Sequence, residues 1–145
     1  MGKRIFGTGN IYHIYNRGIE KRNIFIDNSY YYHFISILKH YLEYDCPYSI
    51  FQQRMEQTKT NAGKESVLAW LESNRIKRPV DIISLCLMPN HYHLTLEQKV
   101  GNGISFYMHK IGLSYTNYFN IRLERTGRLF EGTYKDVLVE TDEQL

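Results

Sequence analysis

The chain has 145 residues, of which 43% are hydrophobic and 23% charged, and its formal net charge is +3. This composition excludes an intrinsically disordered chain and is typical of one globular domain with its own core. No run is apolar enough to cross a bilayer, and the basic start lacks the apolar core of a signal peptide. We therefore expect one cytoplasmic domain over residues 1–145, with Cys46 and Cys86 as small buried residues and no disulfide.

The first half of the chain predicts a strand, a helix and an insertion. Residues 7–16 alternate after a glycine-rich start, as strands do. Residues 29–44 carry apolar side chains at helical spacing, and Asp27 or Asn28 is a suitable N-cap. Residues 50–78 include a polar run without an apolar period, so we expect an exposed insertion in which residues 67–74 form one short helix.

The second half predicts two adjacent strands, a long helix and a last strand. Residues 80–88 form a continuous apolar run suited to a central strand, and Pro89-Asn90 breaks it. Residues 91–98 alternate as a strand, residues 104–125 have a helical period, and residues 134–140 read as a strand. This order predicts an α+β fold: a ferredoxin-like antiparallel sheet with two main helices packed on one face.

The last residues carry a signal for the start of a helix. Thr141 is followed three residues later by Gln144, which is the spacing of a capping box. A capping box normally precedes a helix, and here only Leu145 follows. We therefore expect the chain to be a C-terminally truncated piece of a longer protein.

Two histidines, His91 and His93, stand one residue apart in the strand that follows the turn. Side chains at positions i and i+2 share a face of a strand, with Cα atoms roughly 6.5–7 Å apart. Two imidazoles at this spacing can bind one metal ion and leave positions open for a substrate, which suits Lewis-acid chemistry on a phosphate. The residues alone do not select between Mg²⁺, Mn²⁺ and Zn²⁺. The alternative is that both are structural histidines near a sheet edge.

Two other families of phosphate-handling enzymes use similar histidine patterns. A histidine-triad nucleotide hydrolase needs a third histidine where this chain has Thr95. A two-histidine phosphoesterase needs a second triplet of histidine, hydrophobic residue and Ser or Thr, besides the one at residues 93–95, and the other histidines supply none. The sequence therefore disfavours both families.

Three segments, in this order, resemble a known family. They are "YHIYNRGIEKRNIFID" (residues 12–27), "CLMPNHYHLTL" (86–96) and "YTNYFNIRLERTGRLFEGTYKDVLVETDEQL" (115–145). They cover nearly all of the chain outside the insertion and are similar to the IS200-like tyrosine transposases, most of all to the branch associated with repetitive extragenic palindromes (REP). In that family, His91-Tyr92-His93 would be the histidine–hydrophobic–histidine (HUH) metal motif.

The resemblance implies an HUH endonuclease and strand transferase that takes part in DNA transposition and recombination. A divalent cation, Mg²⁺ or Mn²⁺, held by His91 and His93 would polarise a phosphate of single-stranded DNA flanked by a hairpin. A tyrosine would attack that phosphate, form a 5′-phosphotyrosine link and release a 3′-hydroxyl. IS200-type relatives are dimers that share active sites, whereas the REP-associated branch need not be dimeric, so the resemblance leaves a homodimer open.

The attacking tyrosine stays open at this point. Tyr115 and Tyr118 lie in the long helix after the metal strand, which is a suitable element to present a nucleophile. In the resembling branch the nucleophile lies on a later helix, which would follow Leu145, together with an Asn that is a plausible further metal ligand. The family pattern therefore favours a nucleophile beyond Leu145 and a core or stacking role for Tyr115 and Tyr118; within the chain, Tyr115 is the remaining candidate. If the later helix carries the nucleophile, this chain should bind metal and DNA and cleave poorly or not at all.

Seven basic residues gather near the three segments and are our candidates for DNA contacts. Basic side chains neutralise phosphates and position DNA without reading its sequence. The alternative for each of them is a solvated surface position. The seven are Arg17, Lys21, Arg22, Arg122, Arg125, Arg128 and Lys135.

Two other functions remain open at the level of the sequence. One is a truncated or domesticated relative that binds DNA hairpins without cutting them. The other is an unrelated ferredoxin-like domain in which the histidines and tyrosines are structural. The 13 tyrosines fit every interpretation, because a phenol ring stacks on nucleic-acid bases and also fills the edge of a small core.

Overall fold

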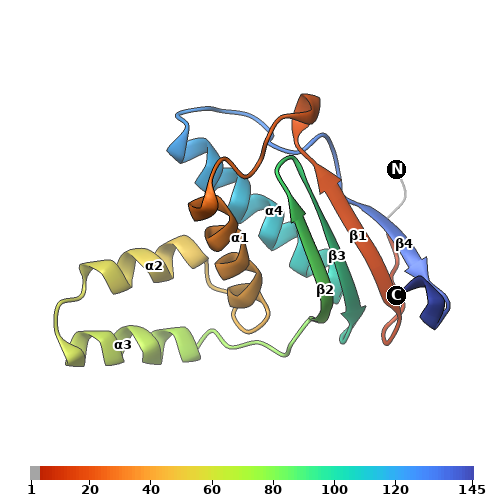
Figure 1. Cartoon of the computed structure of the whole chain (residues 1–145). Helices are drawn as coiled ribbons and strands as arrows, with labels where there is room; N and C mark the ends of the chain where they lie inside the picture. Colours follow the sequence, from red (N-terminus) through yellow and green to blue (C-terminus); the bar gives the residue numbers. More distant parts are fainter. Residues whose placement is uncertain (1–3) are drawn as a thin grey trace.

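The computed structural model describes residues 4–145 (Figure 1). Its main helices and strands follow the predicted order, with one more helix than predicted between the first helix and the second strand. In chain order they are β1 (Ile11–Arg17), the 3-10 helix η1 (Ile19–Lys21), α1 (Asn28–Tyr41), α2 (Tyr48–Gln57), α3 (Asn61–Glu72), β2 (Val80–Met88), β3 (His91–Gln98), α4 (Gly103–Arg122), β4 (Lys135–Val139) and the 3-10 helix η2 (Asp142–Gln144).

The four strands form one antiparallel sheet in the order β2-β3-β1-β4. Helices α1 and α4 lie on the same side of this sheet, as Figure 1 shows. The ferredoxin-like prediction is therefore confirmed. We call the side of the sheet toward α1 and α4 the covered face and the opposite side the open face.

The prediction of a central strand at residues 80–88 is wrong, because β2 is an edge strand. Ile83 and Leu85 are 46% and 44% exposed, and Cys86, which we expected to be buried, is exposed as well. A continuous apolar run is typical of a strand with neighbours on both sides and cover on both faces. Here the run has one neighbouring strand, so hydrophobicity alone misplaces it.

The insertion is more regular than its composition indicates. The structure has two helices there, α2 and α3, where the sequence predicts one. They form an antiparallel pair that projects from the side of the domain in Figure 1. The Thr60 side chain accepts a hydrogen bond from the Gly63 N–H (3.0 Å) and caps α3, and Arg54 of α2 lies 4.1 Å above the Trp70 ring of α3. A pair of helices with so much solvated surface needs few apolar residues, which explains the missing period.

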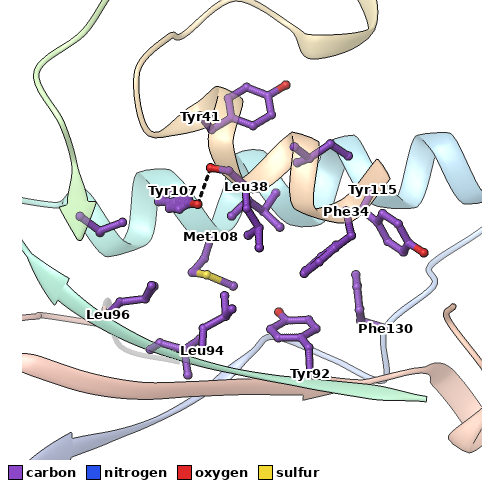
Figure 2. Close-up of a cluster of buried hydrophobic side chains, with 14 of the residues drawn as sticks. Phe34, Leu38, Tyr41, Tyr92, Leu94, Leu96, Tyr107, Met108, Tyr115 and Phe130 are labelled. Atoms are coloured by element: carbon purple, nitrogen blue, oxygen red, sulfur yellow. Dashed lines mark hydrogen bonds between the residues drawn. The ribbon is translucent and has the colours of Figure 1, made fainter. Parts of the chain in front are cut away.

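The core lies between the covered face and helices α1 and α4. Tyr92, Leu94 and Leu96 of β3 are buried and point toward these helices in Figure 2. The Tyr107 hydroxyl of α4 donates a hydrogen bond to the Leu38 carbonyl of α1 (2.6 Å), which ties the two helices together. Burying one such apolar side chain stabilises a fold by about 1.5–3 kcal/mol. Because side chains alternate along β3, His91, His93 and Thr95 then lie on the open face.

Two further expectations concern the capping box near the end of the chain and membrane-spanning segments. The capping box at Thr141 is present, with Gln144 Oε1 accepting from the Thr141 N–H (3.0 Å) at the start of η2. In residues 4–145, the helices are too short or too polar to span a membrane.

Candidate metal and DNA site

The turn between β2 and β3 fixes the position of His91. The Pro89 carbonyl accepts a hydrogen bond from the Ile24 N–H (2.8 Å), and the Asn90 carbonyl accepts one from the Gly18 N–H (2.9 Å). These bonds tie the turn to the segment that follows β1. The strand that carries His91 and His93 therefore begins at a point where two parts of the chain, about 70 residues apart, are hydrogen-bonded to each other.

His91 and His93 lie side by side on the open face, and both side chains are half-buried. Their ring centroids are 5.1 Å apart and the rings are nearly perpendicular, at 88°. His91 Nδ1 lies 2.7 Å from Asn90 Oδ1, and an amide oxygen can only accept a hydrogen bond, so this Nδ1 carries a proton. His93 Nδ1 lies 2.8 Å from His13 Nε2. Both Nδ1 atoms thus have a hydrogen-bond partner, so a ligand of the two rings would approach them at their Nε2 atoms.

This arrangement fits a divalent cation. A cation about 2.1 Å from each Nε2, at an ordinary coordination angle, would separate the two ring centroids by about 5 Å, which agrees with the observed distance. Histidines that bind metals usually donate the other ring N–H to a nearby acceptor, as His91 does to Asn90. Within the described residues, no group of three His, Cys, Asp or Glu side chains is placed to hold an ion. Two nitrogen ligands would leave the other positions for water or a phosphate oxygen.

The protonation of His93 suits the same role. Burial, followed by the neighbouring charges of His13 and His91, lowers the pKa of His93. The neutral imidazole is the form that binds metals. His93 is therefore ready to act as a ligand near neutral pH.

A pocket of about 650 Å³ lies next to His91, between the end of β1, the start of β3 and residues 131–135. Arg17, Lys21 and Lys135 line it, so three of the seven predicted DNA contacts lie beside His91. Arg17 is ion-paired with Glu131, and its hydrogen bond lowers the pKa of the Glu131 carboxyl. This pocket combines cationic side chains with a carboxylate that a bound phosphate would have to displace from Arg17.

The other four predicted DNA contacts lie elsewhere. The Arg22 and Arg125 guanidinium carbons are 5.2 and 5.7 Å from the centroid of the Phe119 ring, and that of Arg122 is 4.8 Å from the Tyr30 ring. Arg128 lines a cavity of about 520 Å³ beside α4, which adjoins the pocket at His91 and shares Asn16 and Tyr92 with it. The structure therefore places three of the basic residues in the pocket beside His91, three around the aromatic rings of Phe119 and Tyr30, and Arg128 in the adjoining cavity.

The structure does not bring the predicted tyrosines to the histidines. Tyr115 is fully buried in the core on the covered face, and its hydroxyl donates to the Ile24 carbonyl. Burial raises the pKa of Tyr115, whereas a phenol must lose its proton to attack a phosphate. Tyr118 stacks on His33 with ring centroids 3.5 Å apart. We therefore correct the assignment of Tyr115, which this geometry makes a core residue.

Sequence reasoning missed two aromatic residues of β1. The register pairs Tyr15 with His93 and His13 with Thr95, so both side chains lie on the open face. The Tyr15 ring centroid is 5.7 Å from that of His93 and 5.2 Å from that of His13. The alternation of residues 11–17 predicts that His13 and Tyr15 share a face. Which strand they lie beside depends on pairing that the sequence does not reveal.

Comparisons with known proteins now bear on this arrangement. No family model and no curated protein sequence matches the chain. A solved structure, that of a REP-associated tyrosine transposase bound to a REP hairpin, is similar over 99% of this chain, with a TM-score of 0.54 and 10% identity. The fold is that of a REP-associated tyrosine transposase. This confirms the fold that the resemblance implied.

The two solved structures cover the chain almost completely, but their sequences differ strongly from it. The chain spans 64% of the length of the hairpin-bound transposase. A second solved structure, named "putative transposase" and from Deinococcus radiodurans R1, aligns with 99% of this chain and 89% of its own, at a TM-score of 0.49 and 13% identity. At such identities a shared transposase fold does not by itself transfer an activity. A function for this chain therefore has to be inferred from the residues of the site.

Proposed function

We propose that this chain is the DNA-binding and cation-binding domain of a transposase-type nuclease that acts on single-stranded DNA beside a hairpin. The observation that carries the proposal is the pair of free Nε2 atoms on His91 and His93, next to a pocket lined by basic residues. The transposase fold and the hairpin held by the similar structure support the same class of substrate.

The side chains divide the work in the proposed complex. His91 and His93 would hold Mg²⁺ or Mn²⁺, which supplies Lewis-acid polarisation of the scissile phosphate. Lys21 and Lys135 would hold neighbouring phosphates in the pocket by charge. Arg17 would add a phosphate contact after exchanging its ion pair with Glu131 for the DNA backbone, and its fork of N–H donors suits two phosphate oxygens.

The proposed covalent step transfers the phosphate from DNA to protein. A tyrosine oxygen gives up its proton and forms a bond to phosphorus, while the bond from phosphorus to the 3′-oxygen of the preceding nucleotide breaks. That 3′-oxygen takes up a proton, so the products are a 5′-phosphotyrosine and a free 3′-hydroxyl. Within the described residues Tyr15 packs on His93, and Tyr115 faces the opposite side of the sheet.

A cleavage assay tests this proposal. A hairpin with single-stranded flanks, labelled at its 3′ end so that the fragment joined to the tyrosine carries the label, is incubated with the protein and Mn²⁺, and the products are separated on denaturing gels. We expect a nicked strand or a covalent adduct that disappears in His91→Ala and in His93→Ala. Cleavage that persists in both variants would contradict the site. An adduct lost in Tyr15→Phe and kept in Tyr115→Phe would place the nucleophile on the open face.

A second candidate function is binding of DNA hairpins without cleavage. The position of Tyr115 and Tyr118 on the helix side favours it, because neither phenol can reach a phosphate held at His91. This function predicts hairpin affinity that exceeds affinity for random single strands and survives loss of both histidines. Clear binding with no nicked product would select it over the nuclease.

A further inference from the structure

We propose that His13 is a positioning residue, which orients the His93 ring and determines which of its nitrogens is free to bind a cation. The inference rests on the proposed cation site at His91 and His93 and extends it to a residue of another strand. It is carried by the hydrogen bond between His13 Nε2 and His93 Nδ1, at 2.8 Å.

The strand register places His13 for this contact. Tyr15 is the direct partner of His93 across β1 and β3, so His13, two residues earlier, is a diagonal neighbour on the same open face. The His13 and His93 rings lie 5.0 Å apart and within 22° of parallel. In this arrangement the Nε2 atom of His13 faces the Nδ1 atom of His93.

The hydrogen bond has two possible directions, and only one leaves His93 able to bind a cation. If His93 Nδ1–H donates to His13 Nε2, the His93 Nε2 atom keeps its lone pair. If His13 Nε2–H donates instead, neutral His93 carries its proton on Nε2 and has no lone pair there. A cation on Nε2 makes the Nδ1–H a stronger donor, so ion binding and the bond to His13 favour each other.

The two histidines of the motif are then oriented in the same way by different means. His91 donates its Nδ1–H to Asn90, the residue just before it in the turn. His93 lies inside the strand and has no such neighbour in sequence, so its partner comes from β1. The Tyr15 ring, 5.7 Å from His93 and 5.2 Å from His13, packs beside both and restricts rotation of the pair.

The first experiment measures Mn²⁺ affinity by calorimetry in the absence of DNA. His13→Leu keeps a side chain of moderate size and removes the acceptor, and we expect Mn²⁺ binding to weaken by about 10–100-fold. His13→Gln places an amide oxygen near the position of Nε2, and we expect it to restore affinity to within about threefold of the wild type. The matched controls are His109→Leu and His109→Gln, at an exposed histidine on α4.

The second experiment reads the proton position directly. Long-range ¹H–¹⁵N NMR correlations distinguish the two tautomers of each imidazole. We expect His93 to carry its proton on Nδ1 in the metal-free wild type and in His13→Gln, and to shift toward the Nε2–H form in His13→Leu. A role for His13 in packing alone would not change the tautomer of His93.

The outcomes separate this inference from the proposed function. Wild-type Mn²⁺ affinity and an unchanged His93 tautomer in His13→Leu would overturn the inference, even if the protein cuts DNA. Weakened Mn²⁺ binding in His13→Leu with rescue in His13→Gln supports it, even if no DNA is cut. A wild-type protein that binds no Mn²⁺ would overturn both.

Discussion

The two faces of the sheet use the same strands for different purposes. On β3, Tyr92, Leu94 and Leu96 fill the core beneath α1 and α4 (Figure 2). His91 and His93 alternate with these residues and are half-buried on the open side. Because side chains alternate along a strand, each buried residue that stabilises the sheet also fixes the direction of its neighbours. The buried residues of β3 therefore fix which way the imidazoles point, and the open face carries polar groups.

The tyrosines show the same division. On the covered face, Tyr107 and Tyr115 donate their hydroxyl protons to the carbonyls of Leu38 and Ile24 and serve as packed core residues. On the open face, Tyr15 lies against His13 and His93. A tyrosine's role in this fold thus depends on the face it occupies, and its helix or strand alone does not reveal that face.

The largest effect should come from a truncation on the covered face. Leu94→Ala removes a fully buried side chain and leaves a cavity, so we expect the free energy of unfolding to fall by about 2–5 kcal/mol in urea titrations. The matched change on the open face is Thr95→Ala, at the next residue, which should cost less than about 1 kcal/mol. Equal losses of unfolding free energy in Leu94→Ala and Thr95→Ala would contradict the assignment of the core to the covered face.

A smaller effect concerns His33, which packs on the helix side against Tyr118. Burial, followed by the charge of Arg122, lowers the pKa of His33 to about 4. Between about pH 6.5 and 4 the unfolded chain therefore binds a proton that the folded chain does not, so stability falls as the pH falls through this range. We expect His33→Gln to remove about 2 kcal/mol of the wild-type loss in unfolding free energy between pH 7 and 4.5, since solvent still reaches part of the ring. The same loss of unfolding free energy in the wild type and in His33→Gln would show that His33 is not the group responsible for this pH dependence.

Removing the Tyr115 hydroxyl should have a milder effect. Tyr115→Phe keeps the ring in the core but leaves the Ile24 carbonyl without this donor, so we expect a loss of about 1 kcal/mol in unfolding free energy. Any nicking of hairpin DNA should be unchanged. A stable variant that no longer cuts would return Tyr115 to the role of nucleophile.

The sequence predicts much of the fold because the relevant signals are local. The period of residues 29–44, the Asp27 cap, which accepts from the Ser29 N–H at 2.8 Å, and the turn at Pro89-Asn90 all depend on neighbours in the chain. They lead to the correct ferredoxin-like order. The edge position of β2 could not be predicted from these local signals, because the neighbours of a strand are set by long-range pairing.

The candidate site also contains residues that local signals predict and residues that only long-range pairing brings together. His91 and His93 are readable as a pair, since residues i and i+2 of a strand share a face. His13 and Tyr15 lie about 80 residues earlier, and only the register of β1 against β3 brings them to His93. Tyr115 has the right spacing for a core position as well as for a catalytic one, and only its burial decides between them.

The smallest expected effect compares two of the groups of basic residues. Arg17 lies in the pocket beside His91, whereas Arg122 stacks on Tyr30 on the helix side. Because each phosphate contact releases counterions, Arg17→Ala should lower the slope of log affinity against log salt concentration for a hairpin with single-stranded flanks by about 0.7–0.9. Arg122→Ala should leave that slope unchanged, as measured by fluorescence anisotropy between 50 and 200 mM salt. A reduced slope in Arg122→Ala and an unchanged one in Arg17→Ala would move the DNA to the helix side and separate it from the histidines.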